Sequence, residues 1–339
     1  MWRAPAFWHH DGLLPRLLSP LSTVLTGVTA LRMRRHGWYC PIPVICVGNA
    51  TVGGAGKTTV ALDLTARLAE HRWAVHVLLR GYGARAGGLS WVEPGDAVTE
   101  VGDEALLHAA VAPTWTCADR RLGAQAAVAA GAEVLVMDDG LQNPSVQKRC
   151  SLLVIDGATG FGNARVLPAG PLREPVAAAA ARCDAAVLIG FDKTGALARL
   201  PAALPVLRAH LVAAPDAAAL NKQRVLAFAG IAMPDKFFTS LAEAGADIVR
   251  RVAFPDHHMF RPDELKALLS QAEQMHALPV TTAKDAVRLP ADTRSRVRVL
   301  RVNLAWEDAM APERLLAGVI NGWAAESRYR RTYAPETPA

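Results

Sequence analysis

The residues with the most definite chemistry lie at positions 47–70, VGNATVGGAGKTTVALDLTARLAE. An apolar strand pattern is followed there by a glycine-rich loop and then by a helical pattern, which is typical of a phosphate-binding loop. Glycines let successive backbone N–H groups point at phosphate oxygens, and the positive end of the helix dipole adds to the attraction. We therefore predict that nucleotide phosphates are bound by Thr51, Val52, Gly53, Gly54, Ala55, Gly56, Lys57, Thr58 and Thr59.

Two side chains of this loop have individual roles in the prediction. Lys57 supplies a mobile positive charge for the β- and γ-phosphates, and the hydroxyl of Thr58 is a ligand for Mg²⁺. Thr51 departs from the strict pattern G-x-x-x-x-G-K-[ST], which has glycine at that position, but it only starts the loop. The loop therefore predicts a nucleotide and Mg²⁺ as cofactors.

A doubled acid ends a second apolar run, EVLVMDDGLQ at residues 133–142. An acid at the end of a strand downstream of the loop is the Walker B arrangement, in which Asp138 reaches Mg²⁺ directly or through water. Asp139 follows at once, and two adjacent carboxylates repel each other unless a cation lies between them. The pair favours a metal site, with a solvated turn as the alternative.

Three further segments carry weaker signals. VGDEALLHAA (101–110) places Asp103 and Glu104 at an expected helix start, where either is also suited to capping. FPDHHMF (254–260) holds His257 and His258, which face different ways, so a shared metal is disfavoured and one of them is a candidate catalytic residue. The Gly- and Pro-rich residues 160–175 end in Arg173 and Glu174 and form either a phosphate contact or a long connection.

Apolar runs without polar alternation predict the strands that position these residues: 42–47, 74–79, 133–138, 151–156 and 185–190. Such runs suit a parallel sheet covered on both faces, and helical patterns between them indicate a doubly wound α/β fold, here a P-loop NTPase-type sheet flanked by helices. The pattern restarts after residue 223, with strands expected at 224–230, 247–254, 278–284 and 296–304. We predict a P-loop domain at 41–215, a smaller α/β domain at 216–330 and a tail at 331–339, whose last residues, APETPA, we expect to be disordered.

Residues 1–40 form a separate N-terminal region with an amphipathic helix. We expect the helix to begin with Ser19 as its N-cap and Pro20 at its first position, followed by an apolar stripe. Some sixteen residues rise about 24 Å, which is short of a bilayer span. Five arginines, one acid and several aromatic residues suit an anionic membrane interface. The alternative is a helix packed on the first domain with its stripe facing protein.

The overall composition indicates a folded globular protein but does not show which anionic partner it binds. The 339 residues are 51% hydrophobic and 20% charged, as in a folded globular protein. The net charge of +6 suits nucleotide phosphates, nucleic acid or acidic lipid alike. Five scattered cysteines without a C-x-x-C pair indicate reduced thiols, with neither a zinc site nor a disulfide framework.

Taken together, the segments resemble one family, the tetraacyldisaccharide 4′-kinases that phosphorylate the lipid A precursor in Gram-negative bacteria. The resemblance covers nearly the whole chain and is most specific in the Gly- and Pro-rich segment and in the order of the motifs. It is carried by residues 43–59, LLRGYG (78–83), VGDE (101–104), DRR (119–121), MDDGLQN (137–143), residues 156–175, FAGIAMPDKFF (228–238), FPDHHMF (254–260) and TTAKDAVRL (281–289). The chain departs from the family pattern at Ala105, Asn143 and Ala283, where proline, histidine and glutamate are usual.

The resemblance implies transfer of the ATP γ-phosphate to the 4′-hydroxyl of a tetraacylated glucosamine disaccharide 1-phosphate, which gives lipid IV-A. It implies that Asp103 is the base, that His257 is paired with it and that Lys57 and Arg173 act on the phosphates. It places Glu104, Asp138, Asp139 and Glu174 around the metal and phosphates. The implied location is the cytoplasmic face of the inner membrane, with the lipid precursor as partner and with no nucleic acid and no obligate protein partner.

Two other readings of the loop stay open on the residues alone. A P-loop kinase for a small sugar or nucleotide would have no use for the basic, Trp-bearing N-terminus. A nucleotide-dependent switch or partitioning ATPase commonly carries an extra lysine before the two glycines, where this chain has Val52.

Overall fold

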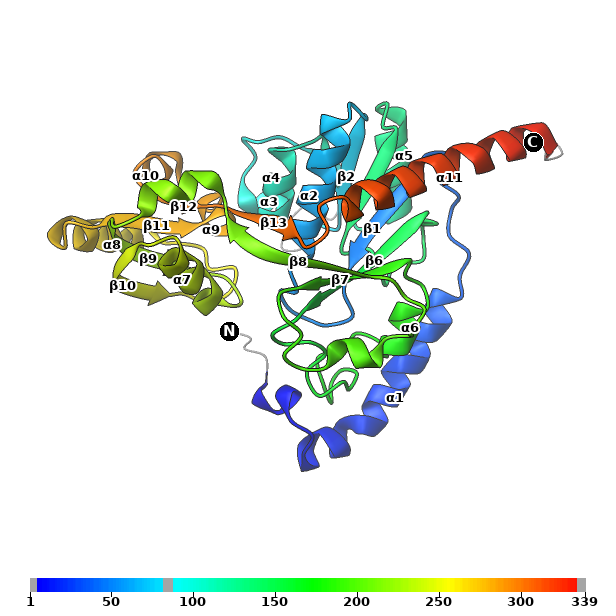
Figure 1. The fold of residues 1–339 in the computed structure, drawn as a ribbon, viewed down its shortest axis with the longest axis horizontal. Coiled ribbons are helices and arrows are strands. Elements are labelled where there is room, and N and C mark those ends of the chain that lie inside the picture. Colours follow the sequence, from blue (N-terminus) through cyan, green and yellow to red (C-terminus); the bar gives the residue numbers. More distant parts are fainter. Residues whose placement is uncertain (1–4, 82–87, 334–339) are drawn as a thin grey trace.

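The chain folds around two sheets, which a computed structural model describes for residues 5–81 and 88–333 (Figure 1). The larger sheet has nine strands, and β1 (Val44–Gly48) lies at its centre between β5 (Val134–Asp138) and β6 (Cys150–Asp156). Beyond β6 follow β7 (Ala185–Ile189), β8 (Val206–Ala213) and β13 (Val302–Trp306); beyond β5 follow β2 (Val75–Leu79), β4 (Thr114–Thr116) and β3 (Ser90–Val92).

The central strands are parallel, and only the edge strands β13 and β3 run antiparallel to their neighbours. Every residue of β1, β2, β5, β6 and β7 is buried, because helices and loops cover both faces of the sheet. This confirms the five strands expected from the uninterrupted apolar runs. The helices of this unit are α2 (Lys57–Glu70), α3 (Val98–Val101), α4 (Asp103–Ala109), α5 (Arg120–Ala129) and α6 (Val176–Ala180), with a 3-10 turn η2 (Ala196–Arg199).

The smaller sheet has four parallel strands in the order β10 (Asp247–Ala253), β9 (Arg224–Ala229), β11 (Leu278–Thr282) and β12 (Arg298–Leu300). Its two faces pack in separate apolar clusters, one around Phe237 and Phe238, the other around Phe228 and Phe260. We call residues 224–300 the small unit and the rest of the fold the large unit. The remaining helices here are η3 (Pro215–Leu220), which leads into the small unit, and α7 (Pro234–Glu243), α8 (Pro262–Gln274), α9 (Ala283–Ala286) and α10 (Ala291–Arg294).

The end of the small unit differs from the sequence-based expectation. The run 296–304, expected as one strand, is split between β12 in the small sheet and β13, which pairs with β8 so that Val302 faces Ala213. Helix α11 (Ala311–Tyr333) then packs on α2, so residues 302–330 belong to the large unit and not to the small one. Apolar residues flank exposed Arg301 on both sides, at Leu300 and Val302. The sequence therefore gives no break between the two strands, although they pair in different sheets.

The return of the chain completes the surroundings of α2, the helix that begins at the phosphate-binding loop. Trp306 donates its indole N–H to Asp63 at 2.9 Å. Glu313 accepts a hydrogen bond from Arg67 at 2.7 Å. The tail predicted at 331–339 is wrong for residues 331–333, which continue α11, while APETPA (334–339) lies outside the described residues.

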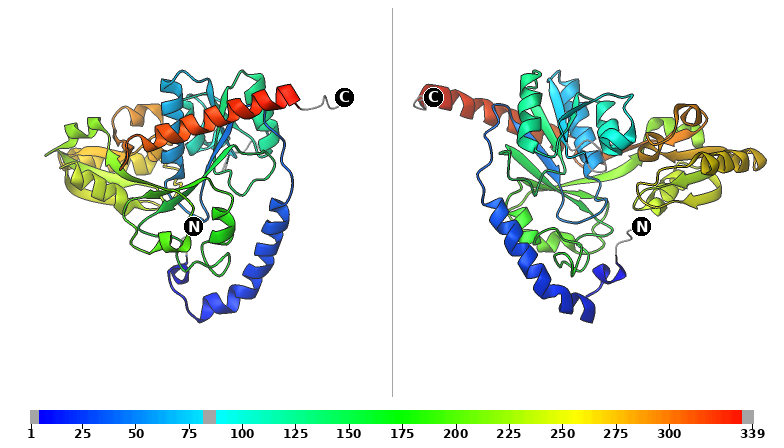
Figure 2. Two further views of the ribbon diagram at one scale, coloured as in Figure 1. Left: turned by 45° about the vertical axis from the view of Figure 1, so that its right-hand side comes forward. Right: turned by 180° about the vertical axis from the view of Figure 1, so that it is seen from behind.

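Helix α1 (Leu13–Met33) runs along the outside of the large unit after a 3-10 turn η1 (Ala6–His9) (Figures 1 and 2). It begins seven residues earlier than expected, because the leucines of residues 13–18 continue the same helical period; Pro20 therefore lies inside it and Ser19 is not its cap. Among the described residues no helix is both long enough and apolar enough to cross a bilayer.

The orientation of α1 separates the two interpretations of its apolar stripe. Pro15 and Ser22 are buried on this helix, and the Ser22 hydroxyl donates to the Val166 carbonyl of the large unit at 2.7 Å. The stripe faces away from the protein: Leu13 is 81% exposed and Leu17 is 75% exposed. Leu14, Leu21, Val24, Leu25, Val28 and Leu31 are exposed as well.

Candidate active site

The phosphate-binding loop follows β1 and leads into α2. Gly56 adopts a φ of +85°, and a Cβ there would lie 2.5 Å from Ile189 Cδ1, so only glycine fits. The Gly- and Pro-rich segment braces the start of the loop: the N–H of Val52 donates to the Pro171 carbonyl at 2.8 Å, and Thr51 bridges to Leu172. The sequence left this segment as either a phosphate contact or a connection, and the structure places it directly against the loop.

Lys57 and Arg173 converge on Asp139. The ammonium of Lys57 lies 3.3 Å from Asp139 Oδ1 and donates to Asn49 Oδ1 at 3.0 Å. Arg173 donates to both carboxylate oxygens of Asp139, at 2.8 and 3.0 Å. Burial raises the pKa of Asp139, but the charges of Lys57 and Arg173 outweigh it and hold that pKa below its ordinary value. Two cations are thus gathered at the mouth of the loop.

Asp138 and Thr58 offer oxygen atoms suited to Mg²⁺. Asp138 ends β5 with 1% exposure; its Oδ2 lies 3.1 Å from His108 Nε2, while its Oδ1 has no partner among the described residues. A buried carboxylate oxygen without a partner fits a cation ligand. Thr58 Oγ1 lies 3.1 Å from Glu104 Oε1, which also accepts from Lys284 at 2.7 Å.

The described residues contain no group of three or more His, Cys, Asp and Glu side chains able to enclose a metal. This fits Mg²⁺, which is commonly held by one or two carboxylates together with substrate phosphates and water. Glu174 has other partners: it accepts two hydrogen bonds from Arg182, at 2.6 and 2.7 Å, and one from Gln142. Its link to the loop runs through Gln142, which also donates to the Asn49 carbonyl.

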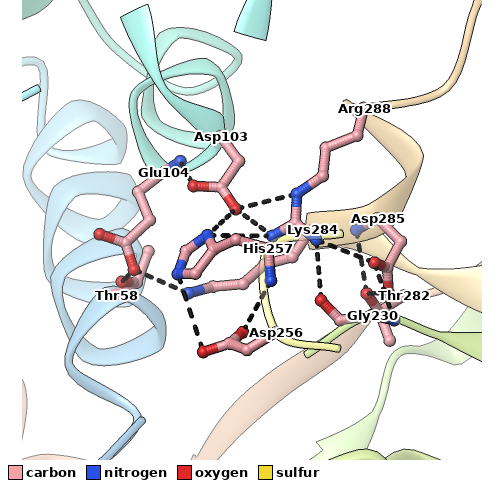
Figure 3. Close-up of polar contacts among 10 residues, drawn as sticks. All are labelled: Thr58, Asp103, Glu104, Gly230, Asp256, His257, Thr282, Lys284, Asp285 and Arg288. Atoms are coloured by element: carbon pink, nitrogen blue, oxygen red, sulfur yellow. Dashed lines mark hydrogen bonds and ion pairs between the residues drawn. The ribbon is translucent and has the colours of Figure 1, made fainter. Parts of the chain in front are cut away.

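Asp103 and His257 meet across the two units (Figure 3). Asp103 is the first residue of α4 in the large unit, and His257 follows β10 in the small unit; Asp103 Oδ2 lies 3.0 Å from His257 Nδ1. Burial raises the pKa of Asp103, but the His257 hydrogen bond and the charge of Arg288 hold it well below its ordinary value. The hydrogen bond to Asp103 in turn raises the pKa of His257.

The neighbouring histidine points elsewhere. His258 Nε2 lies 2.8 Å from Glu264 Oε2, and its ring stacks on Phe254. His257 is held with a φ of +56°, and its N–H donates to the Gly230 carbonyl at 3.0 Å. Of the two adjacent histidines, His257 is therefore the one that contacts Asp103.

Several residues of the site were not singled out from the sequence. Arg288 and Asp285 are buried beside Asp103, and Lys284 bonds to Glu104. All three lie in the segment TTAKDAVRL, whose resemblance to the family marks it without assigning a role to any single residue. His108 lies one helical turn after Glu104 on α4, a spacing that places it on the same helix face. Neither signal shows which partner each side chain meets.

A phosphate-binding loop on β1, an acid ending the adjacent β5, and an acid–histidine pair opposite them define a P-loop phosphotransferase, a kinase of the ATP-dependent class. The sequence profile of the tetraacyldisaccharide-1-P 4′-kinase family matches residues 14–321 of the chain. The chain belongs to this family.

Curated relatives and a solved structure agree with this assignment. The chain is 56% identical over 316 residues to the tetraacyldisaccharide 4′-kinase of Gluconacetobacter diazotrophicus, and the aligned region covers 92% of this chain and 97% of that one. It is 52% identical over 328 residues to that of Rhodospirillum centenum, covering 94% and 97%. The structure of LpxK from Aquifex aeolicus in complex with ATP superposes with a TM-score of 0.72 at 26% identity, over 92% of this chain and 99% of that one.

Proposed function

We propose that this protein transfers the γ-phosphate of ATP to the 4′-hydroxyl of a tetraacylated glucosamine disaccharide 1-phosphate, producing lipid IV-A. Membership of the tetraacyldisaccharide-1-P 4′-kinase family supports the reaction and its lipid acceptor. The single observation that carries the chemistry is the contact between Asp103, on α4 of the large unit, and His257 of the small unit. This contact provides an ionised base for an alcohol, a group that simple nucleotide binding does not need.

The roles of the phosphate-side residues follow from their positions. The backbone of residues 51–59 cradles the phosphates, while Lys57 and Arg173 leave Asp139 to neutralise charge on the transferred group. Bound Mg²⁺ would neutralise further phosphate charge, with Thr58 and Asp138 as its nearest protein ligands and Glu104 beside them. Glu174 fixes Gln142 and Arg182 behind the loop and so acts on the phosphates only through them.

The acceptor side follows from the charge state of Asp103. Because its pKa is held low, Asp103 is ionised at neutral pH and can accept a proton from the sugar hydroxyl as that oxygen attacks the γ-phosphorus. His257 fixes the carboxylate from the small unit and stabilises its charge. Nearly all catalysis by such a site comes from positioning and charge neutralisation, so the loop cations matter at least as much as the base.

The N-terminal helix suits a lipid acceptor. Its exposed apolar stripe and the basic residues that end it fit a helix lying in an anionic membrane interface rather than one packed on protein. We place the protein at the cytoplasmic face of the inner membrane of a Gram-negative bacterium, docked through α1. The lipid precursor is its partner, and neither nucleic acid nor an obligate protein partner is part of the proposal.

The test is transfer of label from [γ-³²P]ATP to the tetraacyl disaccharide 1-phosphate in detergent. We expect a phosphorylated lipid whose formation requires both substrates. Hydrolysis of ATP that is independent of the lipid would favour a switch ATPase, and label on an unacylated sugar or a nucleotide alone would favour a small-molecule kinase. Either outcome would overturn the proposal.

A further inference from the structure

We propose that Arg288 is a positioning residue of the transfer reaction: it holds Asp103 by one oxygen from the small unit and leaves the other oxygen, Oδ1, to receive the hydroxyl proton. This inference rests on the proposed function and deepens it. It is carried by the hydrogen-bond arrangement around Asp103 (Figure 3).

The two oxygens of Asp103 differ sharply in their partners. Oδ2 faces His257 Nδ1 at 3.0 Å and accepts from Arg288 through Nε at 3.1 Å and through Nη2. Oδ1 accepts only the N–H of Glu104, at 2.9 Å, among the described residues. Since a carboxylate oxygen has about two lone-pair sites, Oδ2 is saturated and Oδ1 retains one. Oδ1 is therefore the atom that remains free to take a proton.

Arg288 is fixed independently of Asp103. Its side chain is 1% exposed, and Nη1 donates to Asp285 Oδ1 at 3.0 Å and to the Gly230 carbonyl at 2.8 Å. Asp285, itself fully buried, also accepts the Gly230 N–H at 3.0 Å and lies 2.7 Å from the Thr282 hydroxyl. The small unit thus presents a guanidinium already held in orientation, and Asp103 meets it from α4.

The same backbone carbonyl aligns both partners of Asp103. Gly230 O accepts from Arg288 Nη1 and from the N–H of His257. In addition, α9 of the small unit contacts α4 of the large unit. The geometry at Oδ2 is therefore set by the small unit as a whole, and a change at Arg288 disturbs it without removing His257.

The chemical step is balanced by these groups. The 4′-oxygen forms a bond to the γ-phosphorus, the O–H bond breaks and its proton passes to Asp103 Oδ1, and the bond from the γ-phosphorus to the bridging oxygen breaks, with its electrons leaving on ADP. Arg288 makes no contact with the reacting atoms in this step. Its guanidinium donates two hydrogen bonds to Asp103 Oδ2 and so orients the carboxylate.

The experiment compares Arg288→Gln with Arg288→Lys in the lipid kinase assay. For Arg288→Gln we expect kcat to fall on the order of a hundredfold, as for a misplaced reacting group, with the KM for ATP unchanged. Arg288→Lys restores a cation beside Oδ2 but not the fork, so we expect it to recover only part of the lost kcat. Arg294→Gln is the matched control, because Arg294 lies exposed in α10 and its side chain donates, within the part of the chain that the structure describes, to the carbonyls of Val287 and Leu289.

Full wild-type kcat in either variant overturns the inference, and so does a KM for ATP that rises as kcat falls. If Arg288→Gln fails to fold by circular dichroism, Arg288→Lys decides alone, since the inference requires a reduced kcat together with an unchanged KM for ATP. Failure of the proposed function is distinguishable, because the wild-type protein would then not phosphorylate the lipid at all.

Discussion

Replacement of Asp103 by asparagine is the sharpest test of the base. The substitution keeps the shape of the side chain and removes its charge. The amide oxygen can occupy the place of Oδ2 and accept from Arg288, which puts the NH₂ group at the place of Oδ1, facing the N–H of Glu104. The atom assigned to receive the proton then has no lone pair to offer.

The expected fall in kcat is that of losing a general base while the fold and ATP binding are retained. A positioned general base contributes about 10²- to 10⁴-fold, so kcat should fall by that factor, or about 2.7–5.5 kcal/mol of transition-state stabilisation. The protein should remain folded, because buried Arg288 keeps Asp285 as its counter-ion. ATP affinity should be unchanged, since Thr58 is bonded to Glu104 and not to Asp103.

The assay measures kcat and KM for both substrates with labelled ATP and the tetraacyl disaccharide 1-phosphate, alongside thermal unfolding. Asp119→Asn is the matched control: Asp119 caps α5 through the N–H groups of Arg121 and Leu122, and asparagine caps equally well. A kcat for Asp103→Asn within threefold of wild type, in a folded protein, would refute the assignment of Asp103 as base.

Three further predictions follow from the same structure. Lys57→Ala should reduce lipid phosphorylation by at least roughly 10²- to 10³-fold, as for other removed charge-stabilising groups, and retained activity in the labelled-ATP assay would contradict its role. Replacing both Leu17 and Leu21 of α1 by Gln should weaken sedimentation with phosphatidylglycerol vesicles by roughly 10²- to 10⁴-fold, at about 1.5–3 kcal/mol per apolar side chain, without lowering the unfolding temperature. Unchanged sedimentation would argue against docking through this helix. The pKa of Asp103 in the folded protein lies below its unfolded value of 3.8, so the ionised carboxylate stabilises the fold above that pH and the contribution is lost as the pH falls. In urea unfolding, wild type should therefore lose more stability than Asp103→Asn between about pH 5 and pH 3. Parallel losses in the two proteins would count against the buried ion pair.

The sequence predicted best what depends on local pattern. The central strands are continuous apolar runs, and the phosphate-binding loop is a contiguous motif in which the role of each residue follows from its neighbours. Strand β8 was not predicted because it is only half-buried and lacks such a run. The division at Arg301 was also missed, since β12 and β13 read as one strand and only tertiary pairing separates them.

The site could be predicted only where motif or family resemblance reached it. Asp103 and His257 are 154 positions apart, and no spacing rule joins residues at that separation. Resemblance to the family paired them, and the structure places them in contact. Arg288 could not be found in this way, because a buried guanidinium between two carboxylates is a property of how the small unit meets α4.

The return of the chain to the large sheet has a consequence for biosynthesis. Strand β13 and helix α11 leave the ribosome after the small unit, yet Trp306 and Glu313 bond to α2, which begins at the phosphate-binding loop and precedes the small unit in the chain. A nascent chain that has completed the other described strands still has β8 as an open edge and α2 without these partners. The surroundings of the nucleotide site are therefore finished only after the small unit has been made, although the residues of the site are translated before it.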